Sequence, residues 1–112
     1  MKTVLHLTSN DEGDWGHAIR SASLLSQHTD LEHKDVTLLP HRYGIKVILP
    51  DSPLGPEVSD LIDQSVTVKA GASCFEALGV PREALSGVQI VPSGVTEVVK
   101  LQSEGYNYVK IP

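Results

Sequence analysis

The sequence predicts an α/β protein, a three-layer α/β/α domain with a parallel sheet of about five strands. Short apolar runs rich in β-branched residues alternate with helical patterns along the whole chain. The first run, 3–7, is apolar on both faces, as is typical of a buried parallel strand. Strands that alternate with helices join through right-handed βαβ crossovers, which place helices on both faces of the sheet. The 112 residues are enough for one hydrophobic core and too few for two, so we expect a single domain over 1–112.

Five runs are the predicted strands, and turn-forming residues or prolines lie between them and their neighbours. They are 3–7, 35–39, 66–70, 88–91 and 106–111. The run 45–49 also favours a strand by its β-propensity, although five residues fit a short helix as well. The polar segment 27–34 is expected to be a connection.

Apolar residues three or four positions apart predict the first helix, which begins near Asp14. Asn10, Asp11 or Asp14 can cap it. Its apolar face consists of Trp15, Ala18, Ile19, Ala22 and Leu25.

Further helices follow the later strands. One opens at 51–53, and its apolar face consists of Leu54, Val58, Leu61 and Ile62. Another covers 71–79 and ends at a glycine that a proline follows. We expect a turn of helix at 81–85. The last helix has Ser93 as its N-cap and ends at Gly105.

Composition excludes several classes of protein. A formal net charge of -5 and an aromatic content of 4% argue against nucleic-acid binding, which needs a basic face or stacking aromatics. No apolar stretch approaches the roughly 20 residues that span a bilayer, so we expect no membrane partner. The N-terminal apolar run is too short for a signal peptide, and one cysteine cannot form an intramolecular disulfide. These features predict a cytoplasmic protein.

Known cofactor and metal motifs do not occur. The stretch 13–16 lacks the third glycine of a dinucleotide fingerprint, and no phosphate-binding loop follows any strand, so we expect no cofactor. The five histidines are neither spaced i, i+4 nor flanked by cysteines, and we expect no metal site. His6 and His41 can approach each other if the first two strands are neighbours.

Candidate functional residues follow the strands. The loops after parallel strands gather at one edge of the sheet, where α/β proteins bind their ligands. That edge is expected to hold His6, His41, Tyr43, Ser73 and Cys74.

Cys74 is the only cysteine and is expected in the first turn of the helix at 71–79. The free N–H groups and the positive dipole end of a helix favour a thiolate there, and His41 or His6 can activate a nearby thiol. A second reading fits the residues as well. Cys74 and Leu78 share a helical face, and if that face packs on the sheet, the thiol is a small buried apolar group.

Several stretches resemble one family. The segments 87–99 and 102–112 resemble the C-terminal signature of small proteins of the DsrE/DsrF-like family. Segment 36–45 resembles that family's second strand and its following loop. Segments 51–53 and 70–79 also fit, so the resemblance covers nearly the whole chain.

The resemblance implies a five-stranded parallel α/β/α fold, assembly into trimers or hexamers, and a short helix at 45–49. Better-known members of the family relay persulfide sulfur through a cysteine, in sulfur oxidation or tRNA thiolation. In this sequence Gly71 occupies the position that usually carries the sulfur, and Cys74 lies three residues later, about one helical turn away. Arg42 replaces a residue that is usually glycine.

Two functions remain open. One is an intracellular sulfur (persulfide) carrier or sulfurtransferase-related subunit, with Cys74 as the catalytic sulfur acceptor and a sulfur-relay protein as its partner. The other is a non-catalytic, oligomeric binding or assembly subunit that holds a small ligand or a partner protein. The residues expected to form its binding site are His41, Tyr43, Gly71, Ala72 and Ser73. Gly71 would then allow a close backbone approach.

Overall fold

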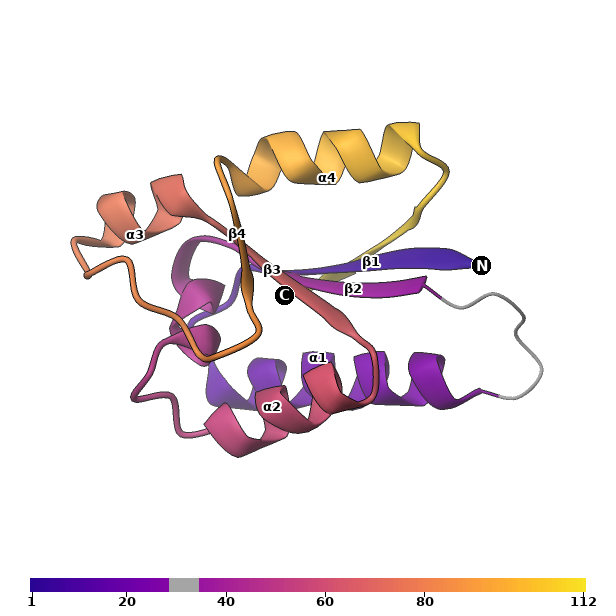
Figure 1. The fold of residues 1–112 in the computed structure, drawn as a ribbon, viewed down its shortest axis with the longest axis horizontal. Coiled ribbons are helices and arrows are strands. Elements are labelled where there is room, and N and C mark those ends of the chain that lie inside the picture. The colour runs from indigo at the N-terminus through magenta and orange to yellow at the C-terminus, as the bar shows by residue number, and fades with distance from the viewer. Residues whose placement is uncertain (29–34) are drawn as a thin grey trace.

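The computed structural model describes residues 1–28 and 35–112, so most of the connection expected at 27–34 lies outside the described residues. Five parallel strands form a sheet in the order β4–β3–β2–β1–β5 (Figure 1). The strands are β1 (Lys2–Leu7), β2 (Asp35–Pro40), β3 (Thr67–Gly71), β4 (Gln89–Val91) and β5 (Asn107–Ile111).

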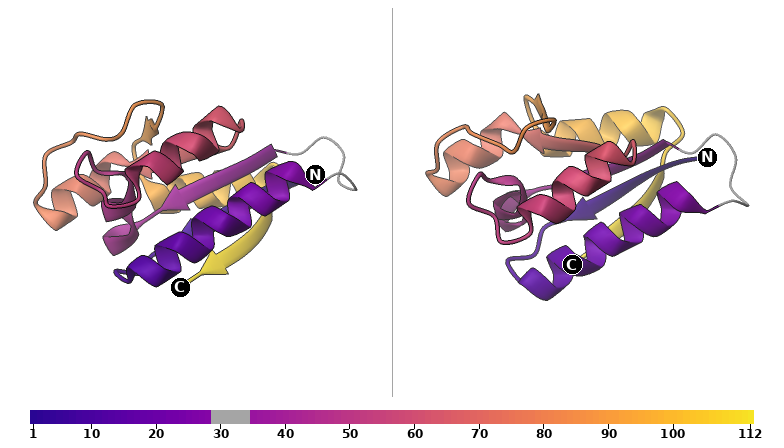
Figure 2. Two further views of the ribbon diagram at one scale, coloured as in Figure 1. Left: turned by 90° about the horizontal axis from the view of Figure 1, so that it is seen from below. Right: turned by 60° about the horizontal axis from the view of Figure 1, so that its bottom comes forward.

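Helices cover both faces of this sheet. They are α1 (Glu12–Gln27), the 3-10 helix η1 (Arg42–Ile48), α2 (Gly55–Asp63), α3 (Ala72–Leu78) and α4 (Gly94–Ser103). The helices α1 and α2 cover one face and α4 covers the other (Figures 1 and 2). Helix α3 lies beyond the carboxyl ends of the strands, and its Cys74 and Phe75 pack in the same core as residues of α1 and α2. The predicted three-layer α/β/α architecture is therefore confirmed. None of the helices in the described ranges has the length and hydrophobicity that crossing a bilayer requires.

The strand expected at 45–49 from β-propensity is wrong. This run lies in η1, where Ile45, Val47 and Ile48 are buried in the main core. The short helix that the family resemblance implies is confirmed there. Burial of the apolar side chains outweighs their intrinsic β preference, because η1 packs them on the sheet without a further strand.

The helical turn expected at 81–85 is also wrong, since this segment is irregular. Its backbone N–H groups bond elsewhere: Glu83 donates to Pro81 O at 2.8 Å, and Leu85 donates to Ile48 O at 2.9 Å. The second bond ties the segment to η1. A contact distant in sequence thus replaces the local helical bond.

Two apolar cores lie on opposite faces of the sheet, because successive side chains of a strand alternate between faces. The larger core, packed by α1 and α2, includes Leu5, Leu38, Val68, Trp15 and Leu61. The smaller core, under α4, consists of Val4, Leu39, Val98 and Leu101.

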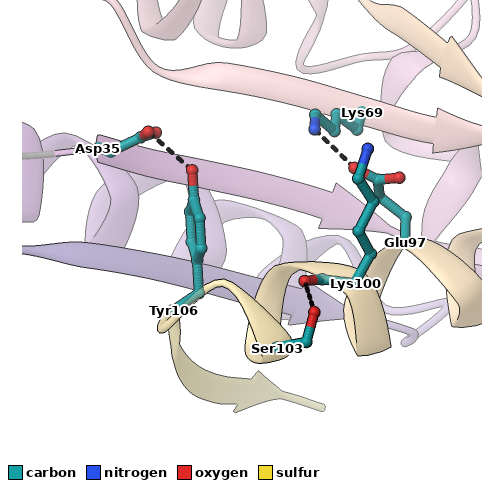
Figure 3. A network of polar contacts seen from close by, with 6 residues as sticks. All are labelled: Asp35, Lys69, Glu97, Lys100, Ser103 and Tyr106. Atoms are coloured by element: carbon teal, nitrogen blue, oxygen red, sulfur yellow. Dashed lines mark hydrogen bonds and ion pairs between the residues drawn. The ribbon is translucent and has the colours of Figure 1, made fainter.

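Polar contacts hold α4 in place beside the smaller core (Figure 3). Lys69 of β3 and Glu97 of α4 form an ion pair at 2.6 Å, and Glu97 is 7% exposed. After α4, the hydroxyl of Tyr106 donates to Asp35 Oδ2 at 2.7 Å. Burial and this hydrogen bond raise the pKa of Tyr106 to about 12. These contacts connect the first turn of α4 to β3 and the chain after α4 to β2.

We predict that Glu97→Ala lowers the free energy of unfolding by about 1–3 kcal/mol, because Lys69 loses its ion-pair partner in a partly buried site. Urea unfolding monitored by circular dichroism measures the change. The double variant Lys69→Met/Glu97→Leu is the control, and it should recover part of the loss. A Glu97→Ala protein as stable as the parent would contradict this role.

Candidate functional site

The carboxyl ends of β2 and β3 lie side by side, because these strands are parallel neighbours in the sheet. The chain continues as η1 after β2 and as α3 after β3, so these two helices meet at the same edge of the sheet (Figure 1). In parallel α/β sheets, this is the usual place of a binding site.

A pocket of about 290 Å³ occupies this place, between η1 and α3. We call it the rim pocket. Its lining residues are His41, Arg42, Tyr43, Ser73, Cys74, Ala77 and Leu78. Hollows of about 260 and 370 Å³ also lie beside Leu49–Asp51 and between α1 and α2, but both are away from the strand ends where ligands of this architecture bind.

The candidate residues divide among three places. His41, Tyr43 and Ser73 line the rim pocket together with Cys74. Ala72 lines a neighbouring hollow of about 450 Å³, which Ser73 also borders. Gly71 lines neither of these two hollows and is buried beneath α4.

Cys74 lines the rim pocket and has 4% of its surface exposed. It belongs to the main apolar core, next to the fully buried Phe75. Among the described residues, no hydrogen bond joins its thiol to His41 or His6. The thiol therefore packs as a small apolar group with one edge toward the pocket.

His6 and His41 meet at the ends of β1 and β2, as the sequence predicted for neighbouring strands. His6 Nε2 is 3.2 Å from His41 Nδ1, and His6 Nδ1 is 2.7 Å from the hydroxyl of Tyr108 on β5. The pKa of His6 is lowered to about 4, mainly by burial and to a smaller extent by the nearby His41 and Lys110. Burial, Arg42 and Lys110 also lower the pKa of His41. Both imidazoles are neutral at pH 7.

Two glycines bring three elements into direct contact behind this pair. A Cβ atom on Gly71 would lie 2.5 Å from the backbone nitrogen of Gly94, and one on Gly94 would lie 2.9 Å from His41 Cδ2. The end of β3 therefore touches the start of α4, which in turn supports the His41 ring. Neither position has room for a side chain, and what approaches Gly71 closely is the chain's own backbone at the start of α4.

The sequence did not indicate every residue of this region. Ala77 and Leu78 line the pocket because they follow Ser73 and Cys74 by one helical turn, a spacing that could have identified them. Tyr108 reaches His6 only because β5 pairs with β1. That strand order has no local signal in the sequence. Within residues 1–28 and 35–112, no group of three or more His, Cys, Asp or Glu side chains is arranged to hold a metal ion.

We predict that Gly71→Ala destabilises the protein by about 1–3 kcal/mol, because the new methyl group forces β3 and α4 apart. The matched control is Gly16→Ala. Gly16 lies within α1 and a Cβ there would meet nothing within 4 Å, so this change should add up to about 1 kcal/mol of stability. Thermal unfolding of both variants measures the difference. If Gly71→Ala is as stable as the parent, the contact between β3 and the start of α4 has room for a methyl group, which would contradict the close approach.

We predict that His6 titrates near pH 4 in the folded protein, as followed by its imidazole carbon shifts in NMR. The ordinary pKa is 6.5, so the unfolded chain binds more protons than the folded chain between these values. The free energy of unfolding should therefore fall as the pH falls through this window, and His6→Gln should reduce that dependence. A midpoint near the ordinary value would contradict the burial of this imidazole.

Comparison with known proteins agrees with this geometry. The family model described as "DsrE/DsrF-like family" matches residues 2–111. A protein of unknown function from Methanobacterium thermoautotrophicum, MTH1491, is 30% identical, with a TM-score of 0.89 and 97% of each chain covered.

More distant structures share the fold. The ychN protein from E. coli is 16% identical with a TM-score of 0.72, and 98% of this chain and 99% of that chain are covered. The protein BT1422 from Bacteroides thetaiotaomicron, of unknown function, is 13% identical with a TM-score of 0.65, and 96% of this chain and 94% of that chain are covered. Among curated proteins, no relative matches this sequence. From the family match over nearly its whole length, the chain belongs to the DsrE/DsrF-like family.

Proposed function

We propose that this chain is a non-catalytic binding subunit of the DsrE/DsrF-like family, with the rim pocket as its ligand site. The observation that carries the proposal is the closed surface at Gly71. By its resemblance to the family, this position is the one that usually holds the sulfur-carrying cysteine. Here a Cβ would lie only 2.5 Å from the backbone nitrogen of Gly94, so a cysteine side chain does not fit at this position.

The pocket itself supports a binding function. It lies at the carboxyl ends of β2 and β3, the edge at which parallel α/β sheets bind ligands. Arg42 on its border has a positive φ of 53°, a conformation that glycine, the usual family residue there, adopts without strain. Residues held in such a strained conformation are typical of functional sites.

A second candidate function, a persulfide carrier, is favoured by one observation. Cys74 borders the same pocket as His41, a neutral imidazole that can accept a proton from a thiol. Its 4% exposure opposes this function, because an approaching partner must bring its sulfur within bonding distance of the thiol. A persulfide carrier would gain one sulfur atom on Cys74 from a persulfide donor and pass it to a sulfur-relay protein, whereas the binding subunit would gain none.

We also propose that the protein is a cytoplasmic homo-oligomer, a trimer or a hexamer as in its family. Val95 and Val99 on the outer side of α4 are 56% and 62% exposed, and Tyr108 is 39% exposed. Tyr108 is paired in register with Val4, whose side chain lies under α4, so all three belong to the same face of the molecule. An apolar face of this kind supports association between copies. The free Cys74 thiol suits a reducing compartment.

We predict that the rim pocket binds components of a fragment mixture, detected as amide shift changes at Arg42, Tyr43 and Ser73 in NMR. Ala77→Phe should abolish these changes, because the ring fills a pocket of this size from its exposed wall. His17→Phe, on the exposed side of α1, is the control and should leave them intact. Binding that survives Ala77→Phe, or that maps to other elements, would argue against the proposal.

We predict that Val99→Lys lowers the oligomeric mass measured by light scattering after size-exclusion chromatography, since a charge is costly in an apolar interface. The matched control is Leu24→Lys on α1, because Leu24 is exposed to the same extent, at 65%, on the opposite face. If both variants or neither of them dissociate, the α4 face is not the interface.

A further inference from the structure

The charge around the rim pocket differs in sign from that of the whole protein. The chain carries a formal net charge of -5, yet among residues 1–28 and 35–112 the charged residue that lines this pocket is Arg42. Arg42 and Lys46 both lie over the ring of Tyr43, at 5.5 and 5.8 Å from its centre. Lys110 approaches from β5, close enough to act on both His6 and His41. The mouth of the pocket is therefore positive.

These cations have no carboxylate partners among the described residues. The ion pairs found there join Lys69 to Glu97 and Arg82 to Glu76. Lys46 donates instead to the side-chain oxygen of Asn10, and Lys110 donates to the hydroxyl of Thr8. Uncompensated positive charge disfavours a cation in this pocket and favours a negative ligand.

The remaining walls are not suited to a fully polar ligand. Tyr43, Ala77 and Leu78 present an aromatic ring and aliphatic groups, and a volume of about 290 Å³ is several times that of one water molecule. An inorganic anion would leave these walls uncovered. The pocket suits a ligand with an anionic group and an apolar body.

We propose that the rim pocket binds a small organic anion, with its negative group beside Arg42 and His41 and its apolar part against the α3 wall. This inference rests on the proposed binding function and adds the class of ligand. His41 hydrogen-bonds to His6 through one ring nitrogen, and its other nitrogen has no partner in the described part of the chain. Arg42 supplies the permanent charge.

Binding of an anion should be coupled to a proton on His41. The groups that face this imidazole are His6 on β1, Lys110 on β5, Arg42 beside it and Cys74 on α3, whereas α4 presents only the backbone of Gly94. Burial and the two cations keep the pKa of His41 low. A bound negative charge opposes the two cations and so favours the protonated ring. Affinity should therefore rise as the pH falls below 7.

The test uses the full chain and three probes whose charges do not change near neutral pH: benzenesulfonate, its neutral analogue benzenesulfonamide, and inorganic sulfate. Amide shifts in NMR titrations report the site and the affinity. Benzenesulfonate should shift Arg42, Tyr43, Ser73 and Ala77 and bind about tenfold more tightly than either other probe, the effect of one charge-assisted contact. Its affinity should increase toward lower pH.

Arg42→Gln should weaken benzenesulfonate binding about tenfold and leave benzenesulfonamide unaffected, while Arg42→Lys should retain most of the affinity. Arg82→Gln is the matched control, because Arg82 lies outside the rim pocket and already has a partner in Glu76. This variant should bind all three probes as the parent does.

Equal binding of the sulfonate and the sulfonamide in this pocket would overturn the anion inference and leave the binding function standing. Sulfonate shifts that map outside the pocket, or no shifts at all, would overturn the inference. The proposed binding function would fail only on a different result, in which no fragment of any charge binds in the pocket.

Discussion

The contact between the backbones of Gly71 and Gly94 determines what the functional edge of this sheet can do. It joins the end of β3 to the start of α4 so closely that a Cβ on Gly71 would lie 2.5 Å from the nitrogen of Gly94. The same start of α4 supports the ring of His41. Position 71 therefore has no room for a side chain. The space available for a ligand is the rim pocket, between η1 and α3.

The polar groups of this edge follow from the strand order. With β1 between β2 and β5, His6 lies between His41 and Tyr108 and hydrogen-bonds to both. Half-burial and nearby cations keep both imidazoles neutral. The cations beside this neutral histidine pair have no carboxylate partner in the described part of the chain. An incoming negative charge therefore gains favourable interactions without first breaking an ion pair there.

The sequence predicted most of the fold because its strongest signals are local. Alternating β-branched runs and helical spacing gave all five strands and the four α-helices, and Ser93 and Gly105 mark the two ends of α4 closely. The segments 45–49 and 81–85 were misread from their residues because contacts distant in sequence decide them: burial of Ile45 and Ile48 in the core, and the bond from Leu85 to Ile48. The candidate site was found in part for the same reason. Strand ends indicated His41, Tyr43, Ser73 and Cys74, whereas the burial of Cys74 and the closure over Gly71 depend on how α3 and α4 pack.

The most direct test of this account is the rate at which a small thiol reagent modifies Cys74 in the folded protein. With 4% of Cys74 exposed, we expect slow modification in the absence of denaturant and acceleration with urea as the core opens. A native rate equal to that of the unfolded chain would mean that the thiol is open at the pocket surface. It would then be available for sulfur transfer, which would contradict the central claim.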